Sequence, residues 1–335
     1  MKLKAGKLEP ELLDRLLSSN VIRDERVIIR PAVGRDVCAI RMGDTCLVAK
    51  TDPITFATDR IGWYVVHVNA NDIATVGARP RWFLVTALLP AGSADEAMLE
   101  SIWDDLRRAL RGIDCELCGG HTEVTVGLDR PILVGQMLGE VRSEDLVDKA
   151  SIRPGDRVLL TKGVPVEGTA IMARERGVDI EGKLPDEVLS RARGFLEDPG
   201  ISVLPEAMAA CAAGEVHAMH DPTEGGVTTG LWELARAAGC GMRVWEDRIP
   251  ILEPGGTLCR YFGLDPLGTI SSGSLLICTR PDDAPRVIAA VEALGTACVD
   301  VGEILPEGDG VLLVRGGRPE PMPVFAQDEI TRLFE

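Results

Sequence analysis

Segments with strand patterns and segments with helix patterns alternate along this chain, in two blocks that a polar, turn-rich stretch separates. The stretch runs from Lys149 to Asp156 and contains Pro154-Gly155, a pair typical of turns. The alternation on both sides of it predicts an α/β (α+β) protein of two domains, residues 1–147 and 148–335. A length of 335 residues agrees with two domains of ordinary size.

The first block contains three strand patterns and two helix patterns. The first helix pattern ends before Gly77, and the second begins at a capping box formed by residues 93–96. The expected strands are residues 46–51, 82–89 and 132–141, and the expected helices are residues 63–76 and 96–112.

The second block follows the same alternation, with one exception. Residues 177–205 are polar and irregular, which predicts a helix and a mobile connection. The expected strands are residues 157–161, 216–220, 275–279, 298–304 and 310–314. Three helices are expected: one that ends at residue 176, and two that cover residues 227–238 and 283–294.

The charge balance excludes several classes of function. Asp and Glu number 52 against 36 Lys and Arg, so the formal net charge is −16. Such a chain is a poor general binder of nucleic acid or of anionic membranes. The longest apolar run, near Trp82 to Ala91, is too short to span a bilayer, and the N-terminal residues lack the apolar core of a signal peptide. Nine irregularly spaced cysteines favour reduced thiols and a cytoplasmic location.

Four acidic residues of the first block lie beside small residues or strand patterns. Such an acid can point into a crevice where backbone N–H groups approach a ligand. Carboxylates suit Mg²⁺, which takes one or two of them together with substrate phosphates. The alternative is that each acid closes a turn or caps a helix. These acids are Asp36, Asp52, which is expected at a strand end, Asp72 and Glu123.

Residues 69–72 interrupt an otherwise apolar helix pattern. Asn69, Asn71 and Asp72 are residue types that form helix interiors poorly. A buried Asp without a partner is costly, so solvent, protein partners or a ligand must reach Asp72. Ligand binding and internal pairing both remain open for this segment.

Two loops of the second block are further candidates. The loop from Lys162 to Thr169 leads into a helix, whose N-terminus suits an anion, although a plain tight turn is the alternative. The segment from His217 to Val227 contains His220, Asp221 and Glu224, which suit proton transfer or phosphate handling. The alternative for this segment is an elaborate helix cap.

Cys115 and Cys118 form a CxxC pair. Zinc requires a second pair or histidines at suitable spacing, and the sequence offers neither. A redox role is the alternative, but two ordinary thiols at a strand are the favoured interpretation.

Together the acidic motifs resemble those of the aminoimidazole ribonucleotide synthetase-like (PurM-like) superfamily, over nearly the whole chain. Residues 33–40 resemble its first acidic motif, with Arg35 in place of the first acid, and Thr51-Asp52, residues 71–80 and residues 119–123 resemble the later ones. The resemblance implies an N-terminal mixed-sheet domain that dimerises and a larger C-terminal α/β domain. It also implies ATP bound through Mg²⁺ at a cleft on the homodimer.

The second half is most similar to the hydrogenase-maturation HypE branch, in residues 221–227 and 263–273. That branch ends in a Cys that carries a carbamoyl group, whereas this sequence ends at Glu335 without one. The Cys-Lys pair of selenophosphate synthetase is also missing, because the first cysteine is Cys38. These departures predict a paralogue with a substrate of its own.

The resemblance also implies a role for each candidate residue. The carboxylates would bind Mg²⁺, Asn71 and His121 would orient phosphate or acceptor, and Gly163 and Gly168 would let backbone approach the acceptor. The implied metal ligands are Asp36, Asp52, Asp72 and Glu123; the implied ATP-binding residues are Asp36, Asp52, Asn71, Asp72, Gly119, Gly120, Thr122, Gly163 and Gly168; and the implied catalytic residues are Asn71, His121, His220, Asp221 and Glu224.

The favoured function is an ATP-dependent enzyme that phosphorylates a carbonyl, amide or similar oxygen of a small-molecule or protein-borne acceptor. A second hypothesis is a nucleotide-binding accessory protein that serves a partner protein in metalloenzyme maturation and has no turnover of its own. A third is a metabolite-binding protein with a degenerate site. Binding of MgATP separates the third hypothesis from the first two.

Overall fold

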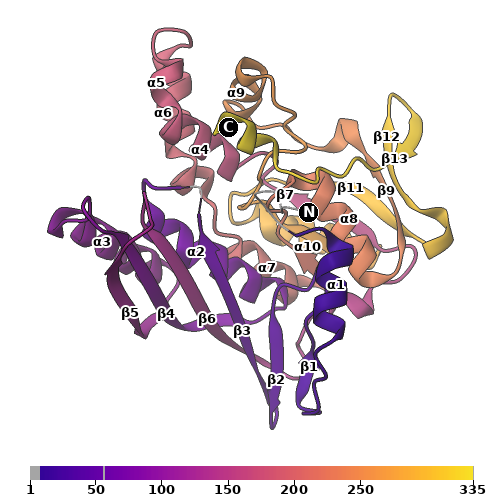
Figure 1. Ribbon diagram of the computed structural model, residues 1–335. Coiled ribbons are helices and arrows are strands. Elements are labelled where there is room, and N and C mark those ends of the chain that lie inside the picture. Colours follow the sequence, from indigo (N-terminus) through magenta and orange to yellow (C-terminus); the bar gives the residue numbers. More distant parts are fainter. Residues whose placement is uncertain (1–7, 56, 335) are drawn as a thin grey trace. The chain divides into compact units, whose positions relative to one another are not determined.

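The computed structural model describes residues 8–55 and 57–334, and the chain divides into two compact units (Figure 1). The N-terminal unit consists of Asp24–Arg30 and Asp36–Leu146. The C-terminal unit begins at Val147 and also includes residues 8–23 and Pro31–Arg35. The units therefore meet in sequence next to the boundary expected after residue 147, but two N-terminal segments pack with the C-terminal unit.

The N-terminal unit contains a six-stranded mixed sheet in the order β1-β2-β3-β6-β4-β5. Only β4 and β5 pair in parallel; the other neighbours are antiparallel. The strands are β1 (Val27–Ile29), β2 (Cys38–Met42), β3 (Thr45–Ile54), β4 (Arg79–Pro90), β5 (Glu116–Thr125) and β6 (Ile132–Arg142).

Helices α2 (Ile61–Thr75) and α3 (Glu96–Gly112) contact each other, and both pack on strands of this sheet (Figure 1). Nearly every residue of α2 is buried, as its apolar composition requires. The expected capping box is wrong in one detail, because Asp95 and not Ser93 is the N-cap residue of α3. Its carboxylate accepts a hydrogen bond of 2.8 Å from the N–H of Met98.

Two glycines of β6 let α2 approach the sheet closely. A Cβ atom at Gly135 would lie 2.4 Å from Asn69 Nδ2, and one at Gly139 would lie 2.4 Å from Ile73 Cγ2. Neither position tolerates a larger residue without movement of the helix. The side chains of Asn69 and Ile73 thereby lie against β6, which sets the position of the polar segment within α2.

The C-terminal unit contains a seven-stranded sheet in the order β13-β12-β9-β11-β7-β10-β8. Only β9 and β12 pair in parallel. The strands are β7 (Arg157–Thr161), β8 (Val216–His220), β9 (Gly241–Trp245), β10 (Leu276–Thr279), β11 (Cys298–Leu305), β12 (Val311–Arg315) and β13 (Arg318–Pro321).

Apolar residues of α8, including Val227 and Leu231, form the core of this unit together with Val158 and Val244 of the sheet. The segment 177–205, expected as one helix and a mobile connection, contains two helices, a π-helical turn and the start of a third helix. The helices are α1 (Pro10–Ser18), α4 (Glu167–Glu175), α5 (Gly177–Ile180), α6 (Asp186–Gly194), α7 (Leu204–Ala213), α8 (Gly226–Ala238), α9 (Gly255–Phe262) and α10 (Ala284–Glu292).

Within the described residues, no helix combines the length and the apolar character that crossing a bilayer requires.

Candidate functional site

Two acidic side chains of the N-terminal unit lie at ion-pair distance from the ammonium group of Lys50, and a third acts on it electrostatically. Its Nζ atom lies 2.7 Å from an oxygen of Asp72 and 3.2 Å from an oxygen of Asp52. Asp36 acts electrostatically on both Lys50 and Asp72. The structure therefore brings together three of the four predicted acids around a lysine that the sequence analysis missed. We call these four residues the carboxylate site.

Strand alternation explains how β3 supplies two of these residues. Val48 is buried in the core, and Lys50 and Asp52 follow it at intervals of two, so the three side chains point to one face of the sheet. Helix α2 packs against β3 and brings Asp72 to that face. Asn69 lies three residues before Asp72 and therefore on the same side of the helix.

The prediction that Asp52 ends its strand is wrong, because β3 continues to Ile54. Asp52 pairs with Gly135 and Pro53 with Val134 of β6. On the other side β2 pairs only as far as Ala49, so within the described part of the chain Pro53 interrupts no ladder there. The result is a strand whose last residues have one free edge, and Asp52 lies on this half-open stretch.

Asn69 is fully buried beside the carboxylate site. Its amide nitrogen donates to the carbonyl oxygens of Val65 at 2.8 Å and Asp52 at 3.3 Å. Its side-chain oxygen has no hydrogen-bond partner among the described residues. Asn71 is also fully buried, on the same helix. The amide of Asn69 thus fixes the backbone that carries Asp52, which is a role that the sequence analysis did not assign.

Burial and mutual repulsion shape the electrostatics of the site. Burial raises the pKa of Asp72 to about 6, against the effect of Lys50, and Asp36 and Asp52 contribute to the rise. Burial alone would lower the pKa of Lys50, but Asp72, Asp52 and Asp36 outweigh it and raise that pKa above its ordinary value. Three carboxylates thus face one ammonium, and the site keeps an excess of negative charge.

The fourth predicted acid, Glu123, lies elsewhere in the unit. The segment from Gly119 to Glu123 forms the exposed middle of the edge strand β5, where His121 Nε2 lies 3.0 Å from Glu123 Oε2. Thr122 between them is exposed. A Cβ atom at Gly120 would lie 1.9 Å from the carbonyl oxygen of Val85, so this position requires glycine.

Strand order separates β5 from the carboxylate site. Strands β6 and β4 lie between β3 and β5. Three strand spacings amount to about 14 Å, so one chain does not bring Glu123 to Asp52 and Asp72. Among the described residues, no group of three or more His, Cys, Asp or Glu side chains has the arrangement of a metal site. The metal-binding roles therefore stay predictions.

Gly163 and Gly168 lie where backbone segments of the C-terminal unit approach each other. Gly163 has a φ of +121°, and a Cβ atom there would lie 2.7 Å from the carbonyl oxygen of Pro250. The N–H of Gly168, in the first turn of α4, donates to the carbonyl of Ile270 at 2.9 Å. Both glycines serve internal packing, and their role towards ATP stays a prediction.

His220 ends β8 and is buried between two charged groups. Its Nδ1 atom lies 3.2 Å from Nζ of Lys149, and its Nε2 atom lies 3.4 Å from a carboxylate oxygen of Glu233. Lys149 also donates to the carbonyl of Gly34 at 2.5 Å. The adjacent Asp221 is buried as well. Lys149 belongs to the predicted polar linker, but it is buried because its short 3₁₀ helix, Lys149–Ser151, packs against β8 and α8.

Asp328 holds the turn that follows Glu224. Its carboxylate accepts hydrogen bonds from the N–H groups of Gly225 at 2.6 Å and Ile330 at 2.9 Å. Burial raises the pKa of Asp328 to about 6 although these N–H groups favour its charged form. None of the sequence motifs pointed to Asp328. Glu224 itself is half-buried.

The CxxC pair divides between a buried and an exposed thiol. Burial raises the pKa of Cys115 to about 12, and its sulfur lies 3.5 Å from the sulfur of Met137. Cys118 is exposed on β5, and both thiols are free. This arrangement agrees with two ordinary thiols at a strand.

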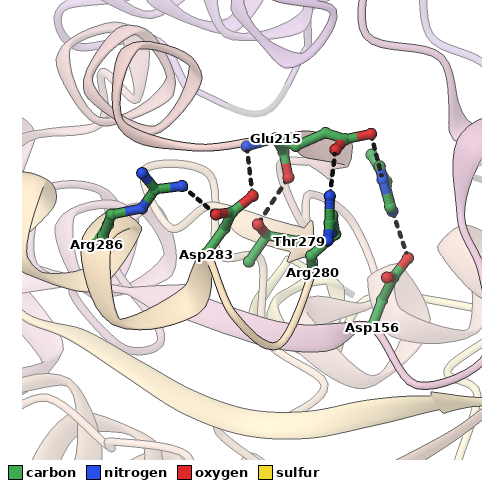
Figure 2. Close-up of polar contacts among 7 residues, drawn as sticks. Asp156, Glu215, Thr279, Arg280, Asp283 and Arg286 are labelled. Carbon is green, nitrogen blue, oxygen red and sulfur yellow. Dashed lines mark hydrogen bonds and ion pairs between the residues drawn. The ribbon is translucent and has the colours of Figure 1, made fainter.

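A further polar network lies at the edge strand β8 and accounts for His217. Its Nδ1 atom lies 2.7 Å from Asp156 and its Nε2 atom 3.2 Å from Glu215. Figure 2 shows Glu215 also in contact with Arg280 and, through its carbonyl oxygen, with Thr279. These contacts connect β8 to β10 and the turn after it, which is a structural role.

Two family models match the chain. The model "AIR synthase related protein, N-terminal domain" matches residues 34–141, and "AIR synthase related protein, C-terminal domain" matches residues 153–315. The chain belongs to the AIR synthase related family. This membership and the two mixed sheets confirm the predicted superfamily and the predicted fold class.

Curated relatives are similar over most of the chain. A protein of Methanocaldococcus jannaschii named for hydrogenase expression and formation is 26% identical over 332 residues, which are 95% of each chain. The carbamoyl dehydratase HypE of Cupriavidus necator is 29% identical over 85% of this chain and 77% of its own.

Solved structures of the family have the same fold. HypE in complex with ATP has a TM-score of 0.70 at 23% identity, covering 87% of this chain and 89% of that one. A HypE–HypF complex matches with a TM-score of 0.71 at 20% identity, over 86% and 93%. AaThiL, complexed with AMPPCP and TMP, has a TM-score of 0.70 at 18% identity, over 92% of both chains.

Proposed function

We propose that this protein is an ATP-dependent enzyme of the AIR synthase related family that phosphorylates a carbonyl, amide or similar oxygen of an acceptor. The carboxylate site carries the proposal, because Asp36, Asp52 and Asp72 come together on the fold that HypE uses with ATP. Phosphoryl transfer depends mainly on positioning and charge neutralisation, and a site of fixed charges suits both.

The donors present fit Mg²⁺. Carboxylate oxygens are the hard ligands that this ion prefers, and one or two of them suffice when phosphates complete its shell. Asp52 and Asp72 already share one cation, the ammonium of Lys50. They would hold Mg²⁺ together with Asp36. Bound Mg²⁺ would neutralise phosphate charge and favour in-line transfer.

The remaining roles follow from position. Asn69 keeps the backbone of Asp52 in place, and the buried Asn71 would orient phosphate. In the C-terminal unit, His220, Asp221 and Glu224 are the candidates for contacts with the acceptor or for holding its proton.

We also propose a homodimer, in which the sheet of the N-terminal unit faces a second copy. On β4, Leu84 and Leu88 are half-buried although they alternate with fully buried residues. On β6, Val134 and Leu138 follow the same pattern. A partly exposed apolar sheet face favours association. Glu123 and His121 on the exposed β5 would then be available to the site of a partner subunit.

The second candidate function is an accessory role in metalloenzyme maturation without independent turnover. The observation in its favour is the likeness to HypE, which is known in complex with HypF, together with the relative named for hydrogenase formation. Nine free cysteines support a cytoplasmic location for either function. Release of ADP or AMP by the protein alone favours the enzyme, and release only with a partner protein favours the accessory role.

Calorimetry with MgATP tests the proposal. We expect the wild type to bind, and Asp72→Asn to lose most of the affinity because it removes a buried carboxylate of the site. Asp104→Asn is the matched control, since this exposed residue of α3 loses the same charge away from the site. A folded wild type that does not bind MgATP would overturn the proposed function.

A further inference from the structure

The residue of the carboxylate site that no motif predicted is its only cation. Lys50 Nζ lies 2.7 Å from Asp72 and 3.2 Å from Asp52, and Asp36 adds to its electrostatic environment. Among the described residues, the two groups at ion-pair distance from this ammonium are both carboxylates. They are also the groups that would hold Mg²⁺ in the proposed function.

We propose that Lys50 makes the carboxylate site selective for a divalent cation that arrives with a nucleotide over a free divalent cation. The inference rests on the proposed function and adds a residue to it. In the nucleotide-free protein the ammonium competes for the carboxylate oxygens that a free cation needs. An anionic polyphosphate offers that ammonium an alternative partner, so phosphate binding and release of the carboxylates are coupled.

The charge count explains the direction of this selectivity. Asp36, Asp52 and Asp72 together carry three negative charges, which would attract a bare divalent cation and repel a polyphosphate. Lys50 reduces the excess to two negative charges and adds an ammonium group at ion-pair distance from Asp52 and Asp72. One residue thus weakens binding of the free cation and reduces repulsion of the nucleotide.

The exposure of the side chains favours exchange of partners over a closed structural pair. The side chain of Lys50 is 14% exposed and that of Asp52 is 34% exposed, whereas Asp72 is almost fully buried. The site is therefore open on the side of Asp52. A long, flexible lysine side chain at such an opening can leave one set of oxygens for another without unfolding of its strand.

Binding of Mn²⁺ without nucleotide, followed by electron paramagnetic resonance, tests the inference. We expect Lys50→Met to bind Mn²⁺ roughly tenfold more tightly than the wild type, because a competing charge within about 4 Å is removed. Lys50→Arg keeps the charge and should bind as weakly as the wild type. Lys183→Met, an exposed lysine in the C-terminal unit, controls for the loss of one positive charge.

Two further variants keep the test decisive. Adding Asp72→Asn to Lys50→Met should abolish the gain, which assigns it to the carboxylate site and not to the acidic surface. If Lys50→Met does not fold, as judged by circular dichroism, Lys50→Gln replaces it with a neutral polar side chain of similar length. Unchanged or weaker Mn²⁺ binding by the folded neutral variant overturns the inference.

The outcomes separate the inference from the function on which it rests. Wild-type binding of MgATP without a gain of Mn²⁺ affinity in the Lys50 variants removes the role of Lys50 and leaves the proposed function intact. Failure of the wild type to bind MgATP removes the proposed function itself and, with it, the selectivity for a nucleotide-borne cation.

Discussion

Two lysines of this protein that pair with carboxylates have opposite environments. Lys50 in the N-terminal unit faces three carboxylates and is partly exposed. Lys162 in the C-terminal unit faces one carboxylate, Glu206, at 3.0 Å, and both side chains are 4% exposed. Its other hydrogen bonds go to the carbonyl oxygens of Ser202 at 2.6 Å and Gly273 at 2.8 Å.

The difference distinguishes a site from a structural pair. Lys162 and Glu206 balance each other in charge, and backbone carbonyls satisfy the remaining donors of the ammonium, so Lys162 keeps no donor for a ligand. Around Lys50 the charges do not balance, and solvent reaches Asp52. Burial also lowers the pKa of Lys162 despite Glu206, whereas the carboxylates raise that of Lys50. The candidate site thus differs from the structural pair by its excess of negative charge and by the solvent exposure of Asp52.

The largest effect should come from breaking the balanced pair. We expect Lys162→Met to lower the free energy of unfolding by about 3–5 kcal/mol, because it leaves Glu206 charged, buried and without its cation. The double variant Lys162→Met/Glu206→Met should recover most of this loss, since the buried charge is gone. Urea unfolding, followed by tryptophan fluorescence and circular dichroism, measures the free energy of unfolding of both variants. A greater loss in Lys50→Met than in Lys162→Met would contradict the comparison.

A smaller effect should distinguish the two lysines by their response to Mg²⁺. In Lys50→Met the three carboxylates lose their ammonium, and a divalent cation at about 100 times its dissociation constant should stabilise the variant by about 2.7 kcal/mol. Lys162→Met offers no such site, so its thermal unfolding should not respond. Thermal unfolding with Mg²⁺ and with an equal ionic strength of Na⁺ measures the difference. Equal responses of both variants would show that Mg²⁺ acts on the acidic surface as a whole.

Local patterns were sufficient for most of the secondary structure. The strands at 157–161 and 216–220 match β7 and β8 residue for residue, because apolar runs between turn residues leave few alternatives. Of β5, only a strand at Cys115 and Cys118 was predicted, and its continuation through Gly119-Gly120 to Thr125 was not. Glycine is uncommon in strands, but the hydrogen bonds of β5 with β4 hold this segment in an extended conformation.

The candidate site was predictable in part. Asp72 was suggested by its position in an apolar helix, and the structure gives it Lys50 as a partner. Lys50 itself lies inside an expected strand, where a single lysine gives no signal until alternation places it on the buried face. The separation of Glu123 from Asp52 depends on strand order, which arises from contacts distant in sequence and is not encoded in either local motif.

The smallest expected effect is on the pH dependence of stability, which should differ between the two lysines because their pKa values shift in opposite directions. The pKa of Lys162 is below 10.5 in the folded protein, so between that lowered value and 10.5 the unfolded chain binds more protons. The free energy of unfolding of the wild type, minus that of Lys162→Met/Glu206→Met, should therefore rise with pH in this interval.

The opposite shift applies to Lys50, whose pKa is raised in the folded protein. Its contribution to the free energy of unfolding is fully present below pH 10.5 and is lost only as the pH rises towards the pKa of the folded protein. The difference in free energy of unfolding between the wild type and Lys50→Met should accordingly stay constant from pH 7.5 to about 10. Urea unfolding across this range measures both differences, and parallel slopes for the two lysines would mean that their environments are equivalent after all.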